Sequence, residues 1–234
     1  MDSGKILTVL TKFHGKLTLM SKGAMRPKSG MGSAASLFCC SEFNLYRGRD
    51  FCYPSSAVIK EMFYGLRSST ETYAEACYMA ELCDKLLLYE EYENSKMYEM
   101  LYEAFRVLEK NKSRNIVLAF QIKSACILGV RPELNRCVHC GDINSNSWIF
   151  DVKEGGLSCD RCSNDSFKIS KGEIDFLKYL IVSRFADLGE IKFSYRIFFL
   201  LNAYLLYQFE ISKIKSEELL SFLYRQQHFS KTIT

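Results

Sequence analysis

The chain of 234 residues is 48% apolar and 25% charged, with a formal net charge of +4 at pH 7. A chain of this size can bury a core as one large domain or two smaller ones, and its 3 prolines and 13 glycines leave little room for linkers or low-complexity tails. The longest apolar run, from Ile197 to Phe209, is too short to span a bilayer. We therefore expect a cytoplasmic protein that contacts no membrane and whose scattered cysteines stay reduced.

Residues 1–63 contain short runs of alternating apolar and polar side chains that glycines separate, as in the strands of a small barrel or sandwich. Lys16 and Lys22 fall on one face of the second run and its leucines fall on the other, so we expect these lysines on an outer surface. The predicted strands are Lys5 to Thr11, Lys16 to Lys22, Ser36 to Tyr46 and Phe51 to Ile59.

Charge is unevenly divided along the chain. Residues 1–63 carry nine Lys and Arg against four Asp and Glu, whereas residues 64–110 carry five against ten. A basic module followed by an acidic one suggests a polyanionic partner for the first and protein partners for the second. Aromatic side chains are interleaved with the basic ones, as in proteins that bind single-stranded nucleic acid. The alternative is a solvated basic rim above core aromatics.

From residue 64 onward the apolar period becomes helical. Ser68-x-x-Glu71 and Ser170-x-x-Glu173 have the form of capping boxes, each of which predicts the start of a helix. Other helices are expected from Ser95, from Ser113 up to Gly129, and over 195–211 and 216–226. The inward face of the first helix is predicted to hold Tyr73, Cys77, Ala80 and Leu87. The bundle core is predicted to hold Phe198, Tyr204, Tyr207 and Phe209.

Two C-x-x-C pairs, Cys137/Cys140 and Cys159/Cys162, lie on either side of residues 141–158. Two residues between paired cysteines let both thiolates approach one metal ion at about 2.3 Å, and the intervening segment can form the hairpin of a zinc ribbon. Because four cysteines complete a tetrahedron, we expect one structural Zn²⁺ with no open coordination position. His139, inside the first pair, is expected to be exposed and not a ligand.

The sequence carries no familiar catalytic motif. Its three histidines are far apart, and it has no G-x-S-x-G, H-E-x-x-H or Walker loop. The glycines at 30–32 follow a polar segment and not an apolar strand, so they do not predict a dinucleotide site. A zinc-ribbon nuclease would need an acidic cluster for catalytic metal, which the sequence lacks. We expect a non-catalytic protein.

The order of these motifs resembles that of the RecO family of bacterial recombination mediators. The matching segments are Lys5 to Thr11, Lys22-Gly23-Ala24-x-Arg26-Pro27-Lys28-Ser29, Leu45-Tyr46-Arg47-Gly48-Arg49, Arg136-Cys137-x-x-Cys140-Gly141, Gly155-Gly156-Leu157-x-Cys159-x-x-Cys162 and Tyr204-Leu205-Leu206-Tyr207. The resemblance implies an α+β fold in which a helical domain with an inserted four-cysteine zinc finger follows an N-terminal OB-fold-like β-barrel. Family members usually begin with a further segment that supplies the first barrel strand, so we expect that strand to be missing here. The implied domains are 1–63 (OB-fold-like), 64–130 (helical, first part), 131–166 (zinc finger) and 167–234 (helical, second part).

The resemblance also implies the function of a mediator of DNA repair and homologous recombination in the bacterial cytoplasm, associated with the nucleoid. Such a protein binds single- and double-stranded DNA, anneals complementary strands coated by single-stranded DNA-binding protein (SSB), pairs with RecR and thereby assists RecA loading. By their position in the matching motifs, Lys16, Lys22, Arg26, Lys28, Arg47 and Arg49 are expected to contact phosphates and Tyr46 to stack on a base. The alternative function is a zinc-containing protein-docking module with only non-specific DNA binding.

Overall fold

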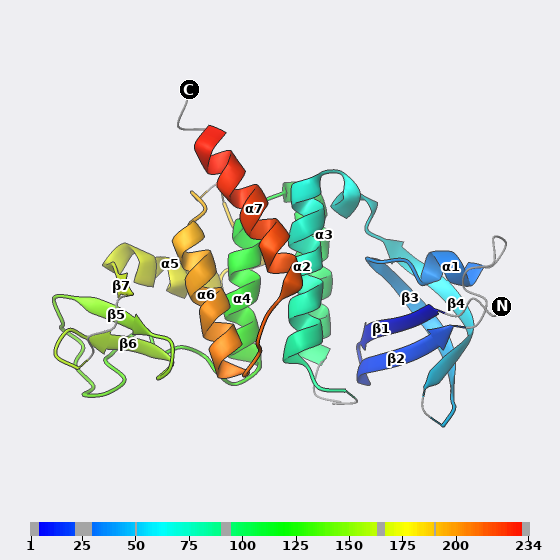
Figure 1. The fold of residues 1–234 in the computed structure, drawn as a ribbon, viewed down its shortest axis with the longest axis horizontal. Coiled ribbons are helices and arrows are strands. Elements are labelled where there is room, and N and C mark those ends of the chain that lie inside the picture. Colours follow the sequence, from blue (N-terminus) through cyan, green and yellow to red (C-terminus); the bar gives the residue numbers. More distant parts are fainter. Residues whose placement is uncertain are drawn as a thin grey trace. The chain divides into compact units, whose positions relative to one another are not determined.

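The computed structural model describes residues 5–21, 30–49, 51–89, 95–162, 167–189 and 191–230. The chain forms two compact units, Met1–Lys110 and Asn111–Thr234. The first contains a β-sheet with helices, and the second contains a helical bundle with a smaller sheet (Figure 1). This architecture confirms the predicted α+β class. The four domain boundaries stay a prediction.

The sheet of the first unit has the strand order β1-β2-β4-β3. Its strands are β1 (Lys5–Thr11), β2 (Gly15–Ser21), β3 (Cys39–Arg47) and β4 (Cys52–Met62). Two antiparallel hairpins, β1-β2 and β3-β4, are joined by a parallel contact at Leu19 and Cys52. All four predicted strands are present, although the third begins three residues later than expected and the fourth extends to Met62.

The described strands leave this sheet open, because β1 and β3 are its outer strands and do not pair with each other. An OB fold has about five strands, and the expectation that the first of them is missing here stays a prediction. The short helix α1 (Gly30–Ala34) contacts β3 and β4. Phe38, Phe63 and Phe105 form an edge-to-face cluster with ring centroids 5.4 and 5.7 Å apart, which fixes α3 (Ser95–Asn111) against the sheet.

The predicted capping box at Ser68 is wrong. Ser68 ends the 3₁₀ turn η1 (Tyr64–Arg67), and α2 (Thr70–Leu86) is instead capped by Ser69, whose hydroxyl accepts a hydrogen bond of 3.1 Å from the backbone N–H of Thr72. The inward face of α2 differs accordingly from the prediction: Tyr73 is 37% exposed, whereas Tyr78, Met79 and Leu82 are fully buried. Of the other predicted inward residues, Cys77 and Ala80 are half-buried and Leu87 is buried as predicted, so the predicted face is wrong chiefly at Tyr73.

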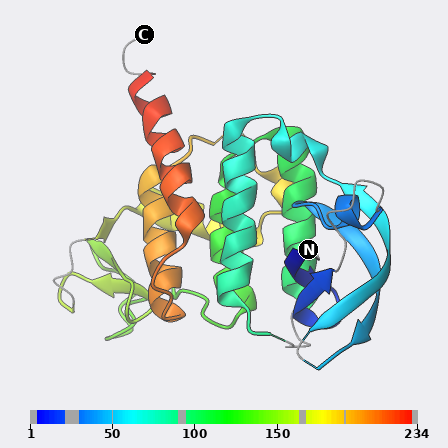
Figure 2. The same ribbon diagram turned by 45° about the vertical axis from the view of Figure 1, so that its right-hand side comes forward.

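The second unit is built on α4 (Asn115–Ile127), which packs against both α5 (Lys171–Val182) and α6 (Tyr195–Gln208). The capping box at Ser170 and Glu173 is confirmed. Helix α7 (Lys215–Ser230) lies beside α6, and its Tyr224 ring is 5.7 Å from that of Phe198 (Figures 1 and 2). Phe198 and Tyr204 are buried as predicted, but Tyr207 is 51% exposed, so the predicted aromatic stripe is wrong there. Among the described helices, none has the length and apolarity to cross a membrane.

A small sheet of order β6-β5-β7 interrupts this bundle between α4 and α5. Its strands are β5 (Trp148–Asp151), β6 (Gly156–Cys159) and β7 (Lys168–Ile169). It rests on α6: Phe150 is fully buried with its ring 5.6 Å from that of Tyr204, and the Gln208 amide donates to the carbonyl of Val152 at 2.9 Å. The segment thus shares its hydrophobic core with the helix beneath it.

Gly156 makes the closest backbone approach in this sheet and generates a stability prediction. A Cβ at Gly156 would lie 2.5 Å from the backbone oxygen of Glu133, so we expect Gly156→Ala to lower the free energy of unfolding by about 1–3 kcal/mol. The matched control is Gly172→Ala in α5, where a Cβ meets open space. Urea unfolding followed through Trp148, the only tryptophan, measures both; equal stability of the two variants would contradict the packing.

Candidate metal centre and nucleic-acid interface

The structure brings together all four cysteines that the sequence predicted as ligands. The sulfur atoms of Cys137, Cys140, Cys159 and Cys162 lie within 4.8 Å of one another, and those of Cys140 and Cys159 are 3.7 Å apart. Sulfurs placed tetrahedrally at about 2.3 Å from a metal are about 3.8 Å from each other. The cluster therefore has the dimensions of a tetrahedral metal site.

Backbone hydrogen bonds form the turn that carries each cysteine pair. In the first turn the N–H of Gly141 donates to the carbonyl of Cys137 at 2.9 Å, with Gly141 at φ +75°, where glycine is favoured. In the second turn the N–H of Cys162 donates to the carbonyl of Cys159 at 3.0 Å. An ion pair of 2.6 Å between Arg161 and Asp142 joins the two turns. The hairpin β5-β6 connects them covalently, so the four sulfurs are positioned by local structure.

The sulfur atoms differ in their ease of ionisation. Burial opposes ionisation of Cys137, but backbone N–H groups of Cys140, Cys159 and His139 directed at its sulfur outweigh burial and lower its pKa to about 5. Hydrogen bonding with the sulfurs of Cys159 and Cys140 raises the pKa of Cys162 to about 12. Ionisation of one cysteine thus opposes ionisation of its neighbours. A bound cation would supply the positive charge that lets all four ionise.

His139 lies outside the cluster of possible ligands. Its side chain is exposed, and its Nε2 is 3.5 Å from a carboxylate oxygen of Asp151. The prediction that cysteines alone supply the ligands agrees with this placement.

Lys16 does not lie on the outer surface where the sequence placed it. Only 6% of it is exposed. Its ammonium group donates to the backbone oxygen of Asp84 at 2.5 Å, lies 3.3 Å from the Asp84 carboxylate and sits 4.2 Å from the centre of the Tyr89 ring. The expectation of exposure is wrong because the end of α2 and the segment after it cover this face of β2.

The remaining predicted DNA contacts fall into two groups. Lys22, Arg26 and Lys28 lie outside the described residues. Tyr46, Arg47 and Arg49 are exposed at the end of β3 and in the turn after it. The Tyr46 ring is 57% exposed and stacks on Tyr53 with centroids 5.3 Å apart.

Arg47 and Arg49 line a cavity of about 260 Å³ whose wall also includes Lys16, Phe51 and Tyr89. Tyr89 is 55% exposed and was missed as a candidate, because it follows α2 and comes close to the β3-β4 turn only in the folded chain. The cavity combines cationic and aromatic side chains, which are the groups that bind phosphates and bases.

Comparison with known proteins covers both units. Residues 1–63 match the model of the recombination protein O N-terminal domain, and residues 67–218 match that of the recombination protein O C-terminal domain. The chain belongs to the RecO family. Three relatives are DNA repair proteins RecO, each 32% identical to this chain: that of Alkaliphilus metalliredigens over 82% of this chain and 79% of its own, that of Desulforamulus reducens over 96% and 90%, and that of Pelotomaculum thermopropionicum over 89% and 84%. RecO membership confirms the expected family and supports a role in DNA repair and recombination.

The cysteine cluster predicts one tightly bound metal ion per chain. We expect Cys137→Ser and Cys159→Ser to lose it, because three sulfurs cannot complete the tetrahedron, and to loosen β5 and β6 while the first unit stays folded. Cys126→Ser in α4 is the matched control and should keep the metal. Elemental analysis of reductively purified protein and hydrogen exchange measure these outcomes, and clearly less than one equivalent in the unmodified chain would rule out the site.

Proposed function

We propose that this RecO family protein is a non-catalytic mediator that binds single- and double-stranded DNA and anneals complementary strands coated by SSB. With RecR as its partner, it assists RecA loading. The observation that carries the proposal is the match of both units to RecO models, over residues 1–63 and 67–218. Annealing requires a surface that holds two negatively charged strands close together, and it needs neither a nucleophile nor nucleotide hydrolysis.

The metal in this proposal is one structural Zn²⁺ held by Cys137, Cys140, Cys159 and Cys162. Soft thiolates in a tetrahedral arrangement select zinc over harder divalent cations. Zinc supplies folding free energy to a segment that is too small to hold its own core. With four protein ligands it has no open position for a substrate, so its role is to keep β5 and β6 in place.

DNA phosphates bind, in this proposal, at Arg47 and Arg49 of the N-terminal OB-fold-like unit. Both side chains are exposed beside the aromatic faces of Phe51 and Tyr89 in the cavity described above. Lys16 contributes positive potential from beneath, although its ammonium group is already paired with Asp84. Tyr46 offers a half-exposed ring to a base. We include Lys22, Arg26 and Lys28 among the proposed phosphate contacts only because of their positions in the sequence motifs.

The phosphate contacts can be tested by salt dependence. We expect Arg47→Ala/Arg49→Ala to weaken binding to all oligonucleotide sequences alike and to make the slope of log affinity against log salt shallower by about 1.4, because each phosphate contact on a single strand contributes about 0.7. Fluorescence anisotropy of a labelled oligonucleotide at several salt concentrations measures the slope.

The matched control removes two exposed cations of the same unit that do not line the cavity. Lys12 lies 3.3 Å from Glu99, and Lys60 pairs with Glu42. Lys12→Ala/Lys60→Ala should leave the slope nearly unchanged. If the control lowers the slope as much as the arginine variant, the contact is diffuse and not located at Arg47 and Arg49.

Annealing distinguishes a mediator from a docking module. We expect the protein to accelerate pairing of complementary oligonucleotides without ATP, also when they are coated with the SSB of the same bacterium, and Arg47→Ala/Arg49→Ala to slow this pairing. A fluorescence-quenching assay with strands labelled at opposite ends measures the rate. Pairing no faster than the spontaneous rate, with DNA binding intact, would favour the zinc-containing protein-docking module instead.

A further inference from the structure

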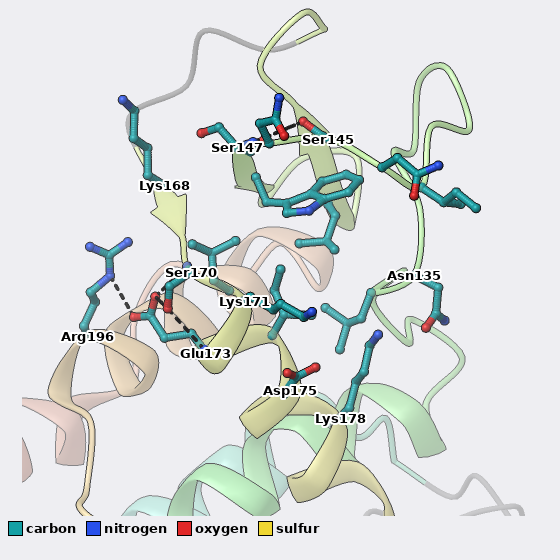
Figure 3. A pocket seen from close by; sticks show the side chains of 18 residues that line it. Asn135, Ser145, Ser147, Lys168, Ser170, Lys171, Glu173, Asp175, Lys178 and Arg196 are labelled. Carbon is teal, nitrogen blue, oxygen red and sulfur yellow. Dashed lines mark hydrogen bonds and ion pairs between the residues drawn. The ribbon is translucent and has the colours of Figure 1, made fainter.

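The second unit contains a cleft of about 760 Å³ between the small sheet and the start of α5 (Figure 3). One wall is the loop at 143–147 together with Trp148 of β5, and the other is β7 with the first turns of α5. Buried apolar side chains support it from below, namely Leu134, Leu157, Ile169 and Ile174, each at most 5% exposed. The cleft thus has a buried apolar floor and walls from two segments that are separate in the sequence.

The charged groups of the cleft leave it positive. Arg196 pairs with Glu173 at 3.2 Å, and Glu173 also caps α5 by accepting from the backbone N–H of Ser170. Three lysines lie around the opening, and none of them forms an ion pair with a described residue: Lys168, Lys171 and Lys178. Asp175 is the remaining acid of the lining. An anionic ligand in the cleft would therefore meet three positive charges from the lysines and one negative charge from Asp175.

The uncharged lining suits a base. Trp148 is half-buried in the wall, and Ile143, which also lines the cleft, is 65% exposed. An indole ring can stack on any nucleobase, because every base has a π-face. Asn135, Asn144 and Asn146 add amide groups, which both donate and accept hydrogen bonds as base edges require.

We propose that this cleft binds a short segment of single-stranded nucleic acid, with a base against Trp148 and phosphates at Lys168, Lys171 and Lys178. The inference rests on the proposed function, because it gives the second unit a strand of its own while the first unit holds another. An acidic peptide would satisfy the lysines but would leave the indole and the amides without a specific role, so nucleic acid fits the lining better.

The single tryptophan makes the site directly observable. A short oligothymidine added to the full zinc-loaded chain should quench the fluorescence of Trp148. Lys168→Ala/Lys171→Ala/Lys178→Ala should raise the concentration for half-maximal quenching about tenfold or more at low salt, because three phosphate contacts are lost. The matched control, Lys153→Ala/Lys192→Ala/Lys213→Ala, removes three exposed lysines of the same unit outside the cleft and should leave quenching unchanged.

A second variant covers the stacking contact. Trp148→Phe keeps an aromatic ring in β5 but removes the fluorescent signal. Binding to this variant is measured by the acylation of Lys168, Lys171 and Lys178, and we expect bound oligothymidine to protect these lysines from the reagent. Metal content and circular dichroism of each variant check that the cysteine segment and the helices are folded.

The outcomes separate this site from the DNA site of the first unit. If anisotropy shows that oligothymidine binds but Trp148 is not quenched, the proposal that the cleft binds nucleic acid is wrong and the proposed function still stands. No binding by either measurement would overturn both. A polyglutamate peptide that quenches Trp148 at lower concentration than the oligothymidine would assign the cleft to an acidic protein segment.

Discussion

Four sulfur atoms held within 4.8 Å are the constraint on which the structure of residues 131–162 depends. They cannot all ionise without a cation between them, and the strands that carry them are too short to be stable alone. The four clustered sulfurs mark one end of this segment, and the contact between Phe150 and Tyr204 holds the other end against α6. The loop at 143–147 and Trp148 form a wall of the cleft. Their position depends on the sulfur cluster and on the contact between Phe150 and Tyr204.

Lysine and arginine serve different purposes in this chain according to what covers them. Lys16 is buried by Asp84 and Tyr89 and so acts as a packing residue, whereas Arg47 and Arg49 line the same cavity with less of their surface covered. A buried ammonium group with a carboxylate beside it is already neutralised, and it gains little from a phosphate. A guanidinium group differs from an ammonium group because it can contact a phosphate through two N–H groups at once.

The sequence predicts features that depend on nearby residues and misses those that depend on distant ones. The cysteine spacing correctly predicts that the four sulfurs cluster, and Ser170 is a correct cap because the Glu173 side chain in turn accepts from the Ser170 backbone N–H. Ser68 fails because Ser69 is an equally good cap, and the 3₁₀ turn before it decides between them. Alternation in β2 cannot reveal that a segment about 70 residues later covers Lys16. The cleft is likewise assembled from residues 134–196, and no local pattern predicts it.

The open sheet of the first unit has a consequence for how the protein meets other chains. β1 and β3 each present one side of backbone N–H and C=O groups that no described strand pairs, and Ile6 on β1 is 60% exposed. Such an edge is a template for strand addition, since an incoming segment can extend the sheet without breaking any hydrogen bond already made. Because side chains alternate along a strand, the incoming segment must present its apolar residues in the register that β1 sets. Strand addition at such an edge depends on the order of apolar and polar residues in the added segment and not on its composition alone.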